Sequence, residues 1–134
     1  MSDFAINDEN LKNLINNFLN FLTTQKRASK HTIDSYRIDI SYFLSFLKNH
    51  FDQKEITIDI LQNLTIHDFR KWLLMRNQKE FSNSSTARAL SCLRSFFAFT
   101  AKNKIITNSK IENIKTPKIG KSIPKAVDEV DIKS

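Results

Sequence analysis

The chain has 134 residues, the length of one ordinary domain, and can bury a core without disulfides or a bound metal. Lys and Arg number 21 against 14 acidic residues, so the net charge of +7 favours a polyanionic partner, nucleic acid before a membrane surface. The single cysteine, Cys92, excludes an internal disulfide and a cysteine-based zinc site. Because no apolar run approaches the roughly 18 residues of a membrane span, we expect a cytoplasmic protein that does not enter a membrane.

Glycine and proline divide the chain near its C-terminal end. The only glycine, Gly120, lies between the only two prolines, Pro117 and Pro124, and the residues before them lack these helix breakers. Lysines are concentrated in the same region, whereas acidic and apolar residues alternate in the last segment like the first turn of a further helix. The expected divisions are a flexible N-terminus at 1–7, a helical domain at 8–114, a basic linker at 115–126 and the start of a truncated further domain at 127–134.

Apolar residues recur at intervals of three and four along 8–114, which predicts amphipathic helices and an all-α fold. The first helix is expected over about 8–26, and a second begins after Ser29, a suitable N-cap, and ends near Asn49. The expected apolar faces are Leu11, Leu14, Ile15, Phe18 and Leu22 in the first helix, and Ile33, Tyr36, Ile40, Phe43, Leu44 and Leu47 in the second.

Two further helices follow. Thr65 and Asp68 resemble a capping box, which predicts a third helix that ends near Lys79. Ser84 or Ser85 can cap the fourth helix, whose expected apolar side is Ala89, Leu90, Leu93, Phe97 and Ala101. The segment 56–60 alternates like a strand but has no partner strand, so we interpret it as an extended connection. A short fifth helix with Ile111 and Ile114 is expected after Asn108.

The face of the fourth helix opposite its apolar side is polar and basic. At 100° per residue its members fall within about 60° of one another, and they are Ser84, Arg88, Ser91, Ser95 and Lys102. An arginine can fork onto guanine or phosphate and serine hydroxyls can reach phosphates or base edges, so this face suits a DNA groove. The alternative is an ordinary solvated face on a core helix.

A second basic cluster lies at the junction of the first two helices and consists of Lys26, Arg27, Lys30, His31 and Thr32. Cations, a hydroxyl and the backbone N–H groups of a helix N-terminus suit phosphate binding. The alternative is an ordinary basic loop. Arg94 projects between the polar face and the core, so it can either contact DNA or brace the fourth helix through its aliphatic stem.

The residues that catalysis or metal binding would need are not arranged for it. His31, His50 and His67 lack the spacing of a helical metal pair, and Tyr36 and Tyr42 lack the surroundings of a nucleophile. No phosphate-binding loop or nucleotide fingerprint occurs either. We therefore expect no enzymatic activity, no metal, no cofactor and no small-molecule substrate for this chain alone.

Three segments together resemble the N-terminal, core-binding domain of Xer-type tyrosine recombinases. The segment 29–39 is similar to the family's Ser/Ala-x-x-Thr-Leu-x-x-Tyr-Arg-x-Asp opening of a helix, and 85–97 is similar to its Ala-Arg-x-Leu-Ser-Ala-Leu-Arg-x-Phe-Phe. Pro117-Lys118 followed by Ile123-Pro124-Lys125 is similar to the linker that joins the family's two domains. The second of these segments is the most specific.

The resemblance implies a SAM-like domain of four to five helices in two crossed hairpins, with the second and fourth helices facing the major groove of duplex DNA. It also implies a parent enzyme that cuts and rejoins DNA at paired recombination sites and resolves chromosome dimers at cell division. Its implied partners are a recombination half-site and a sister recombinase or a second copy in a tetrameric complex. The sequence of residues 89–97 is more similar to the C-type than to the D-type of the two sister recombinases in this family.

The candidate DNA-contacting residues that follow from the two basic faces and the resemblance are Lys26, Arg27, Lys30, His31, Thr32, Ser35, Ser84, Thr86, Arg88, Ser91, Arg94, Ser95 and Lys118. Two alternatives remain open at this point. One is the same domain in a phage-type integrase, and the other is a stand-alone basic helical module that binds a protein or a membrane surface.

Overall fold

The structure of the protein is a computed structural model that describes residues 8–117. The elements in chain order are α1 (Glu9–Thr24), α2 (Lys30–His50), α3 (Ile58–Gln62), α4 (Ile66–Gln78), α5 (Asn83–Lys102) and the 3-10 helix η1 (Lys110–Asn113). No strand occurs among these residues, so the predicted all-α fold is confirmed for them. The segments expected to be a flexible N-terminus (1–7), most of the linker and the start of a further domain lie outside the described range.

Side-chain caps start the helices where polar residues precede apolar runs. Asp8 caps α1, and the Ser29 hydroxyl accepts from the Thr32 backbone N–H at 3.1 Å to cap α2. At the start of α4 both halves of the predicted capping box form between Thr65 and Asp68. The sequence therefore determines three of the helix starts locally.

Two local predictions were wrong. The fourth long helix is capped by Ser82, not by Ser84 or Ser85, because the first capping residue after the α4 turn already has extended backbone and accepts from Ser85 N–H at 3.0 Å. The segment expected to be an extended connection at 56–60 contains the start of α3, whose N-cap is Thr57. A helix of five residues has too few turns to show a helical period in the sequence.

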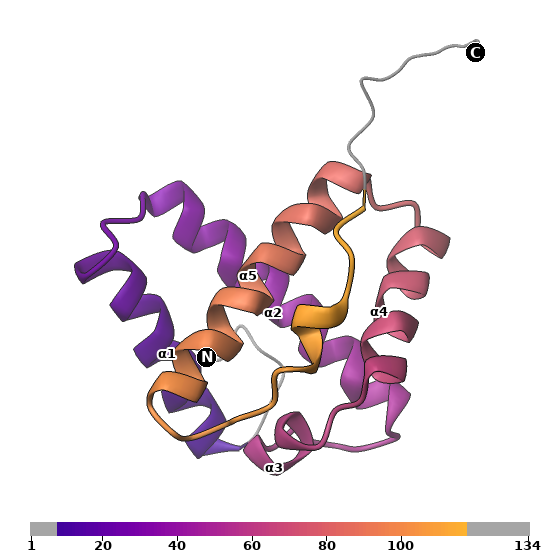
Figure 1. Ribbon diagram of the computed structural model, residues 1–134, viewed down its shortest axis with the longest axis horizontal. Coiled ribbons are helices and arrows are strands. Elements are labelled where there is room, and N and C mark those ends of the chain that lie inside the picture. Colours follow the sequence, from indigo (N-terminus) through magenta and orange to yellow (C-terminus); the bar gives the residue numbers. More distant parts are fainter. Residues whose placement is uncertain (1–7, 118–134) are drawn as a thin grey trace, which may run out of the picture.

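The long helices form two hairpins that cross (Figure 1). The first hairpin is α1 and α2, and the second, more open one is α4 and α5, with α5 lying across α2 near the middle of both helices. Both α2 and α5 begin on the upper side of the view, α2 next to the α1–α2 turn and α5 next to the α4–α5 turn. This arrangement brings the N-terminal ends of two long helices to one side of the molecule.

Aromatic side chains join the hairpins in the core. Phe43 of α2 stacks on Phe69 of α4 at 6.0 Å between ring centroids and meets Trp72 edge-on at 5.3 Å. On the other side, Phe18 of α1 meets Phe96 of α5 edge-on at 5.3 Å. Burial of such rings supplies most of the driving force for docking the helices.

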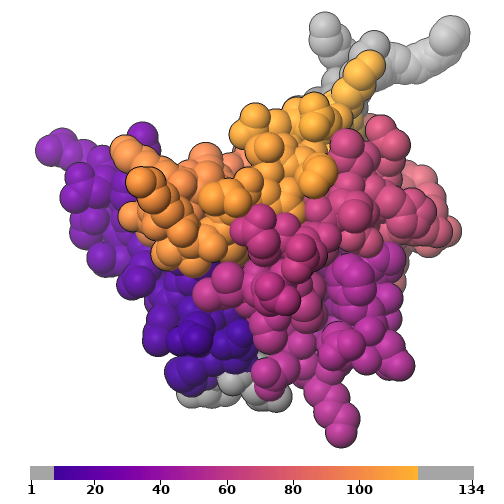
Figure 2. All heavy atoms as spheres, turned by 60° about the horizontal axis from the view of Figure 1, so that its bottom comes forward, coloured from indigo at the N-terminus to yellow at the C-terminus, as the bar shows by residue number. Residues whose placement is uncertain are grey.

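The segment after α5 returns over the two hairpins, and we call residues 105–117 the strap. Figure 2 shows it as an orange and yellow band between α1 and α4. Its apolar residues Ile106, Ile111 and Ile114 are buried, which agrees with the expected packing of a short helix after Asn108. Within residues 8–117 no helix has the length and apolarity that crossing a membrane requires.

Candidate nucleic-acid interface

One side of the molecule, at the top of Figure 1, combines three sources of positive potential, and we call it the basic side. The N-terminal ends of α2 and α5 both lie there, and so does the α1–α2 turn. The N-terminus of a long helix carries partial positive charge and backbone N–H groups without partners inside the helix. Two such ends and a cationic turn on one side form a surface suited to phosphate groups.

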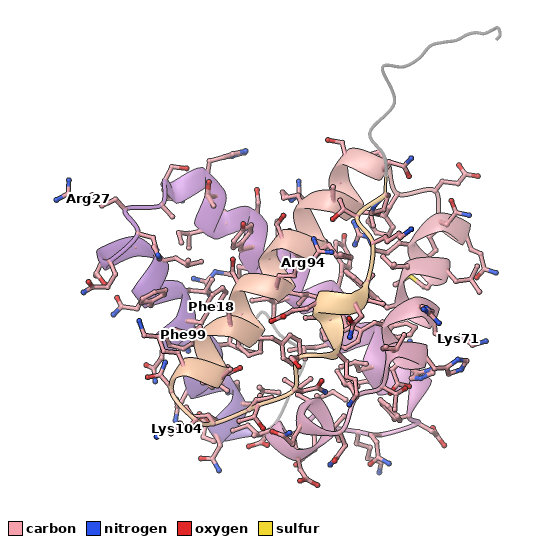
Figure 3. All side chains as sticks on the ribbon, viewed as in Figure 1. Phe18, Arg27, Lys71, Arg94, Phe99 and Lys104 are labelled. Carbon is pink, nitrogen blue, oxygen red and sulfur yellow. The ribbon has the colours of Figure 1, made fainter. Side chains whose placement is uncertain are left out.

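The α1–α2 turn carries the cations that the sequence indicated. Lys26, Arg27, Lys30 and His31 are all exposed, and Figure 3 shows Arg27 extending away from the body of the protein. Arg27 has a positive φ of 55°, which a tight turn between two helices requires. Lys30 forms an exposed ion pair with Asp34 at 2.8 Å, and this hydrogen bond lowers the pKa of Asp34.

The predicted hydroxyl residues of α2 are partly covered. Thr32 and Ser35 are half-buried, and the Thr32 hydroxyl accepts from the Ser29 hydroxyl at 3.1 Å. Thr32 therefore contributes to the cap of α2 through both its backbone and its side chain. Its position in the first turn still leaves it next to the exposed Lys30 and His31.

A groove joins the two basic clusters that the sequence analysis treated separately. Lys26 from the α1–α2 turn lines it together with Ser95 and Lys102 from α5, over the rings of Phe21 and Phe99. The Lys26 ammonium lies 5.8 Å from the centre of the Phe21 ring, a distance at which the cation is attracted to the ring face. Lys26 and Lys102 thus lie at the same hollow, although 76 positions separate them in the chain.

Arg88 is bound to a buried carboxylate. Its Nε donates to Oδ2 of Asp39 at 3.0 Å and its Nη2 donates to Oδ1 at 2.8 Å. The side chain of Arg88 is 46% exposed, whereas that of Asp39 is 1% exposed. The hydrogen bonds to Asp39 raise the pKa of Arg88, so the guanidinium keeps its charge, partly neutralised by the carboxylate.

Thr86 is buried, so the prediction that Thr86 contacts DNA is corrected. It is 6% exposed, and its hydroxyl accepts from Nε of Arg76 at 2.9 Å. Arg76 is itself 1% exposed and also donates from Nη2 to the Ser85 hydroxyl at 2.9 Å. Its guanidinium lies 4.1 Å from the centre of the Phe81 ring. Thr86 therefore holds the α4–α5 turn.

Arg94 takes the second of its two expected roles. It donates to the backbone carbonyl of Ile114 and, from Nη1, to the Thr116 hydroxyl at 2.7 Å. Figure 3 shows it between α5 and the strap. We therefore describe Arg94 as the brace that fixes the end of the strap on α5 through Ile114 and Thr116.

The remaining residues predicted to contact DNA differ in exposure. Ser84 and Ser91 are exposed on α5, and Ser95 is half-buried in the groove with Lys26. Lys118 lies outside the described residues. Among the described residues no group of three His, Cys, Asp or Glu side chains is placed to hold a metal ion.

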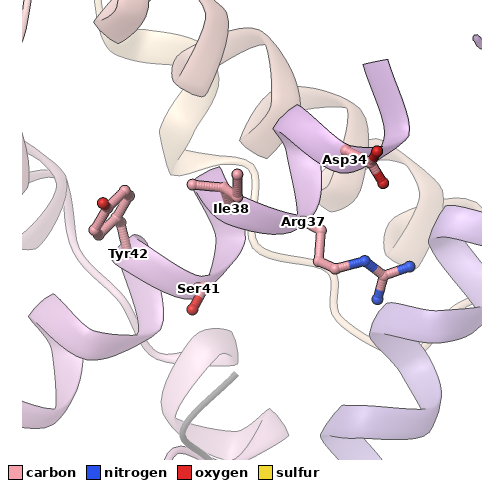
Figure 4. Close-up of a pocket in the computed structure, with 5 residues that line it drawn as sticks. All are labelled: Asp34, Arg37, Ile38, Ser41 and Tyr42. Atoms are coloured by element: carbon pink, nitrogen blue, oxygen red, sulfur yellow. The ribbon is translucent and has the colours of Figure 1, made fainter. Parts of the chain in front are cut away.

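A second, shallow groove follows the outer face of α2 (Figure 4). It is lined by Asp34, Arg37, Ile38, Ser41 and Tyr42. Ile38 is 52% exposed and Tyr42 is 49% exposed, so this lining mixes one acid and one base with large apolar side chains. It lacks the uniform positive charge that suits a phosphate backbone, and we leave it out of the candidate interface.

Sequence reasoning missed Asp39 and Arg76, the two buried charges next to this interface. A signal was present, since each occurs at helical spacing within an apolar stripe. Asp39 lies beside Ile40 and one turn from Phe43, and Arg76 lies one turn after Trp72. A charged residue on a buried face needs a partner, but the sequence does not say which residue supplies it.

Comparison with known proteins assigns the chain to a family. The sequence profile described as "Phage integrase, N-terminal SAM-like domain" matches residues 15–104. The chain therefore belongs to the phage integrase N-terminal SAM-like domain family. No solved structure matches the chain significantly.

The relatives identify the kind of protein in which such a domain occurs. The chain is 35% identical over 125 residues to "Tyrosine recombinase XerC" of Rickettsia rickettsii (strain Sheila Smith). It is 34% identical over the same length to the proteins of that name from Rickettsia felis and Rickettsia canadensis. In each case the match covers 93% of this chain and 41% of the relative. The chain thus corresponds to less than half the length of these tyrosine recombinases.

Proposed function

We propose that the chain is the DNA-binding domain of a XerC-like tyrosine recombinase and that it holds duplex DNA against its basic side. Lys26, Arg27, Lys30 and His31 contact phosphates, and the exposed α5 residues Ser84, Arg88 and Ser91 face the major groove. Thr86 and Arg94 support the fold of this surface.

The observation that carries the proposal is that α2 and α5, which cross each other, both begin on the basic side. Their N-termini and the cationic α1–α2 turn lie on one side, although the helices come from different hairpins. A membrane-surface helix would instead need a continuous apolar face next to its cations. Most apolar side chains of the described helices are buried in the core, and the exposed Ile38 and Tyr42 share their groove with an acid, Asp34, as well as with a base. Family membership supports the same choice of partner.

The parent activity follows from the relatives. We propose that a protein containing this domain cuts and rejoins DNA at paired recombination sites, together with a sister recombinase or further copies of itself. Resolution of chromosome dimers at cell division is the corresponding role. In that protein the domain contributes DNA affinity and orientation.

A salt-titrated binding assay tests the DNA-binding proposal. Fluorescence anisotropy with a labelled duplex is measured for the wild type, for Arg27→Asn and for Lys71→Gln. Asn tolerates the positive φ at position 27, so the turn keeps its conformation. Lys71 is an exposed cation on α4, on another side of the molecule in Figure 3, and its substitution is the matched loss of one charge.

We expect Arg27→Asn to weaken binding to every duplex and to reduce the slope of log affinity against log salt by about one. Lys71→Gln should leave that slope unchanged, because solvent screening removes the effect of charges more than about 8 Å away. Equal effects of the two substitutions would contradict the basic side as the interface. Absence of duplex binding by the wild type would reject the proposed function and favour a stand-alone module.

A further inference from the structure

The pair formed by Asp39 and Arg88 is asymmetric in a way that an ordinary surface ion pair is not. The carboxylate is 1% exposed, while the side chain of the arginine is 46% exposed. Both carboxylate oxygens accept hydrogen bonds, at 3.0 Å and 2.8 Å, from the same edge of the guanidinium. The acid is therefore enclosed by the protein, and the base keeps part of its surface open to solvent.

This geometry fixes the orientation of the guanidinium plane. A guanidinium carries five N–H groups in a rigid fork, and the two-point contact with Asp39 uses the Nε edge and one Nη2 proton. The remaining N–H groups, on Nη1 and Nη2, point away from the carboxylate. They form the kind of paired donor that matches the O6 and N7 acceptors of guanine in the major groove.

Fixing the side chain before DNA arrives has an energetic consequence. A free arginine side chain has rotamer entropy to lose when it is immobilised. Because Asp39 already holds the Arg88 fork, most of that loss precedes binding, and one orientation of the fork is favoured over all others. An oriented fork discriminates between base edges, whereas a mobile cation is attracted equally to any phosphate.

We infer that Asp39 is a positioning residue for DNA sequence preference, which holds the Arg88 fork in the plane that recognises a guanine edge. The inference rests on the proposed function, because it assigns one base contact within the same interface. Asp39 itself does not touch DNA. Its negative charge opposes phosphate binding, so Asp39 raises selectivity at the expense of general affinity.

The experiment separates selectivity from affinity. A duplex preferred by the wild type is first selected from a randomised pool, and its affinity is then compared with those of all its single-base-pair variants. The same set is measured with Asp39→Asn, with Arg88→Lys and with the control Asp34→Asn. Asp34 lies on α2 as well, is exposed and pairs with Lys30, so its substitution removes the same charge without disturbing Arg88.

We expect Asp39→Asn to lose about ten-fold discrimination at one G·C pair while it binds the variant duplexes as tightly as the wild type or more tightly. Arg88→Lys should lose the same discrimination, because an ammonium keeps the charge but has no planar fork. Asp34→Asn should bind all duplexes slightly more tightly and keep the preference. Fluorescence of Trp72, which is fully buried, reports whether each variant is folded.

Retention of the wild-type preference by folded Asp39→Asn would overturn the inference. If Asp39→Asn does not fold, Arg88→Lys provides the test, and an unchanged base preference in Arg88→Lys would also overturn the inference. Loss of preference in Asp34→Asn would also overturn it, because the effect would then follow charge alone. A wild type that binds every duplex equally refutes this inference but leaves DNA binding standing, whereas a wild type that binds none refutes the proposed function.

Discussion

The attachment of the strap depends strongly on one buried amide. Asn108 is 6% exposed, and its Nδ2 donates to three carbonyls around the end of α3, those of Leu61 at 3.1 Å, Gln62 at 3.1 Å and Leu64 at 2.9 Å. Its Oδ1 accepts from the Lys110 backbone N–H at 3.0 Å. Asn108 thus joins the α3–α4 connection to the strap with both ends of its side chain.

Two substitutions at this position separate lost hydrogen bonds from repulsion. Asn108→Ala leaves two buried carbonyls poorly satisfied, and with about 1–3 kcal/mol for each buried group we expect a loss of about 2–4 kcal/mol of unfolding free energy. Asn108→Asp is nearly isosteric but places a carboxylate against three carbonyl oxygens. Near neutral pH it should therefore cost at least about 1 kcal/mol more than Asn108→Ala.

The pH dependence of Asn108→Asp provides a second test. The charged form of the introduced carboxyl is disfavoured in the fold, so its pKa is higher in the folded state than in the unfolded state. The folded state is then relatively more stable below the unfolded pKa and loses that stability as pH rises through the folded pKa. Relative to Asn108→Ala, Asn108→Asp should recover stability on acidification.

Urea unfolding followed by Trp72 fluorescence measures these free energies, because the chain has one tryptophan and it is fully buried. Asn16→Asp, on the exposed face of α1, is the control and should change stability by less than about 0.5 kcal/mol. If Asn108→Asp were no less stable than Asn108→Ala near neutral pH, the three-carbonyl contact would not have the energetic role assigned to it.

Three further predictions concern the buried Asp68 and Arg76 and the partly buried Arg94. Burial raises the pKa of Asp68, but hydrogen bonds from Thr65 and His50 outweigh burial and lower this pKa overall. The Asp68 carboxylate therefore stabilises the fold above its unfolded-state pKa, and this stabilisation disappears as pH falls through its folded-state pKa. In urea unfolding, Asp68→Asn should be about 1 kcal/mol less stable than the wild type near neutral pH and equally stable in acid. Arg76→Lys should be less stable in the same assay than Arg76→Met by about 2 kcal/mol, because a buried ammonium cannot reach both hydroxyls, and equal stabilities would contradict this account. Arg94→Ala should release the end of the strap and accelerate tryptic cleavage after Lys115, and an unchanged digestion rate would show that Arg94 is not the brace.

The long helices and two of their caps could be predicted because their causes are local. The apolar stripe of α1, Ser29 before α2 and the Thr65 capping box each act within one or two helical turns. The five residues of α3 could not be predicted, because so short a helix is stabilised by what covers it. Asn108 of the strap supplies part of that cover through contacts more than forty positions away.

The candidate site was predictable in composition but not in pairing. The positions of the cations around Lys26 and Lys30 follow from the turn between two predicted helices. The role of Arg88 does not, because its partner Asp39 lies 49 positions earlier and on another hairpin. A helical wheel places Arg88 on a polar face correctly and still gives no reason to expect that a buried carboxylate meets it there.

The position of the charges therefore matters more for DNA affinity than the net charge of +7. Asp39 and Arg88 nearly cancel at the surface, so Arg88 adds little to long-range attraction. Screening limits the influence of exposed charges to about 8 Å at physiological salt, so Lys71 on another side contributes little. The phosphate affinity then rests on the α1–α2 turn and on the N-termini of α2 and α5 on the same side of the molecule. In this arrangement the α1–α2 turn supplies general attraction to DNA. The α2–α5 crossing, where Asp39 holds Arg88, distinguishes one base pair from another.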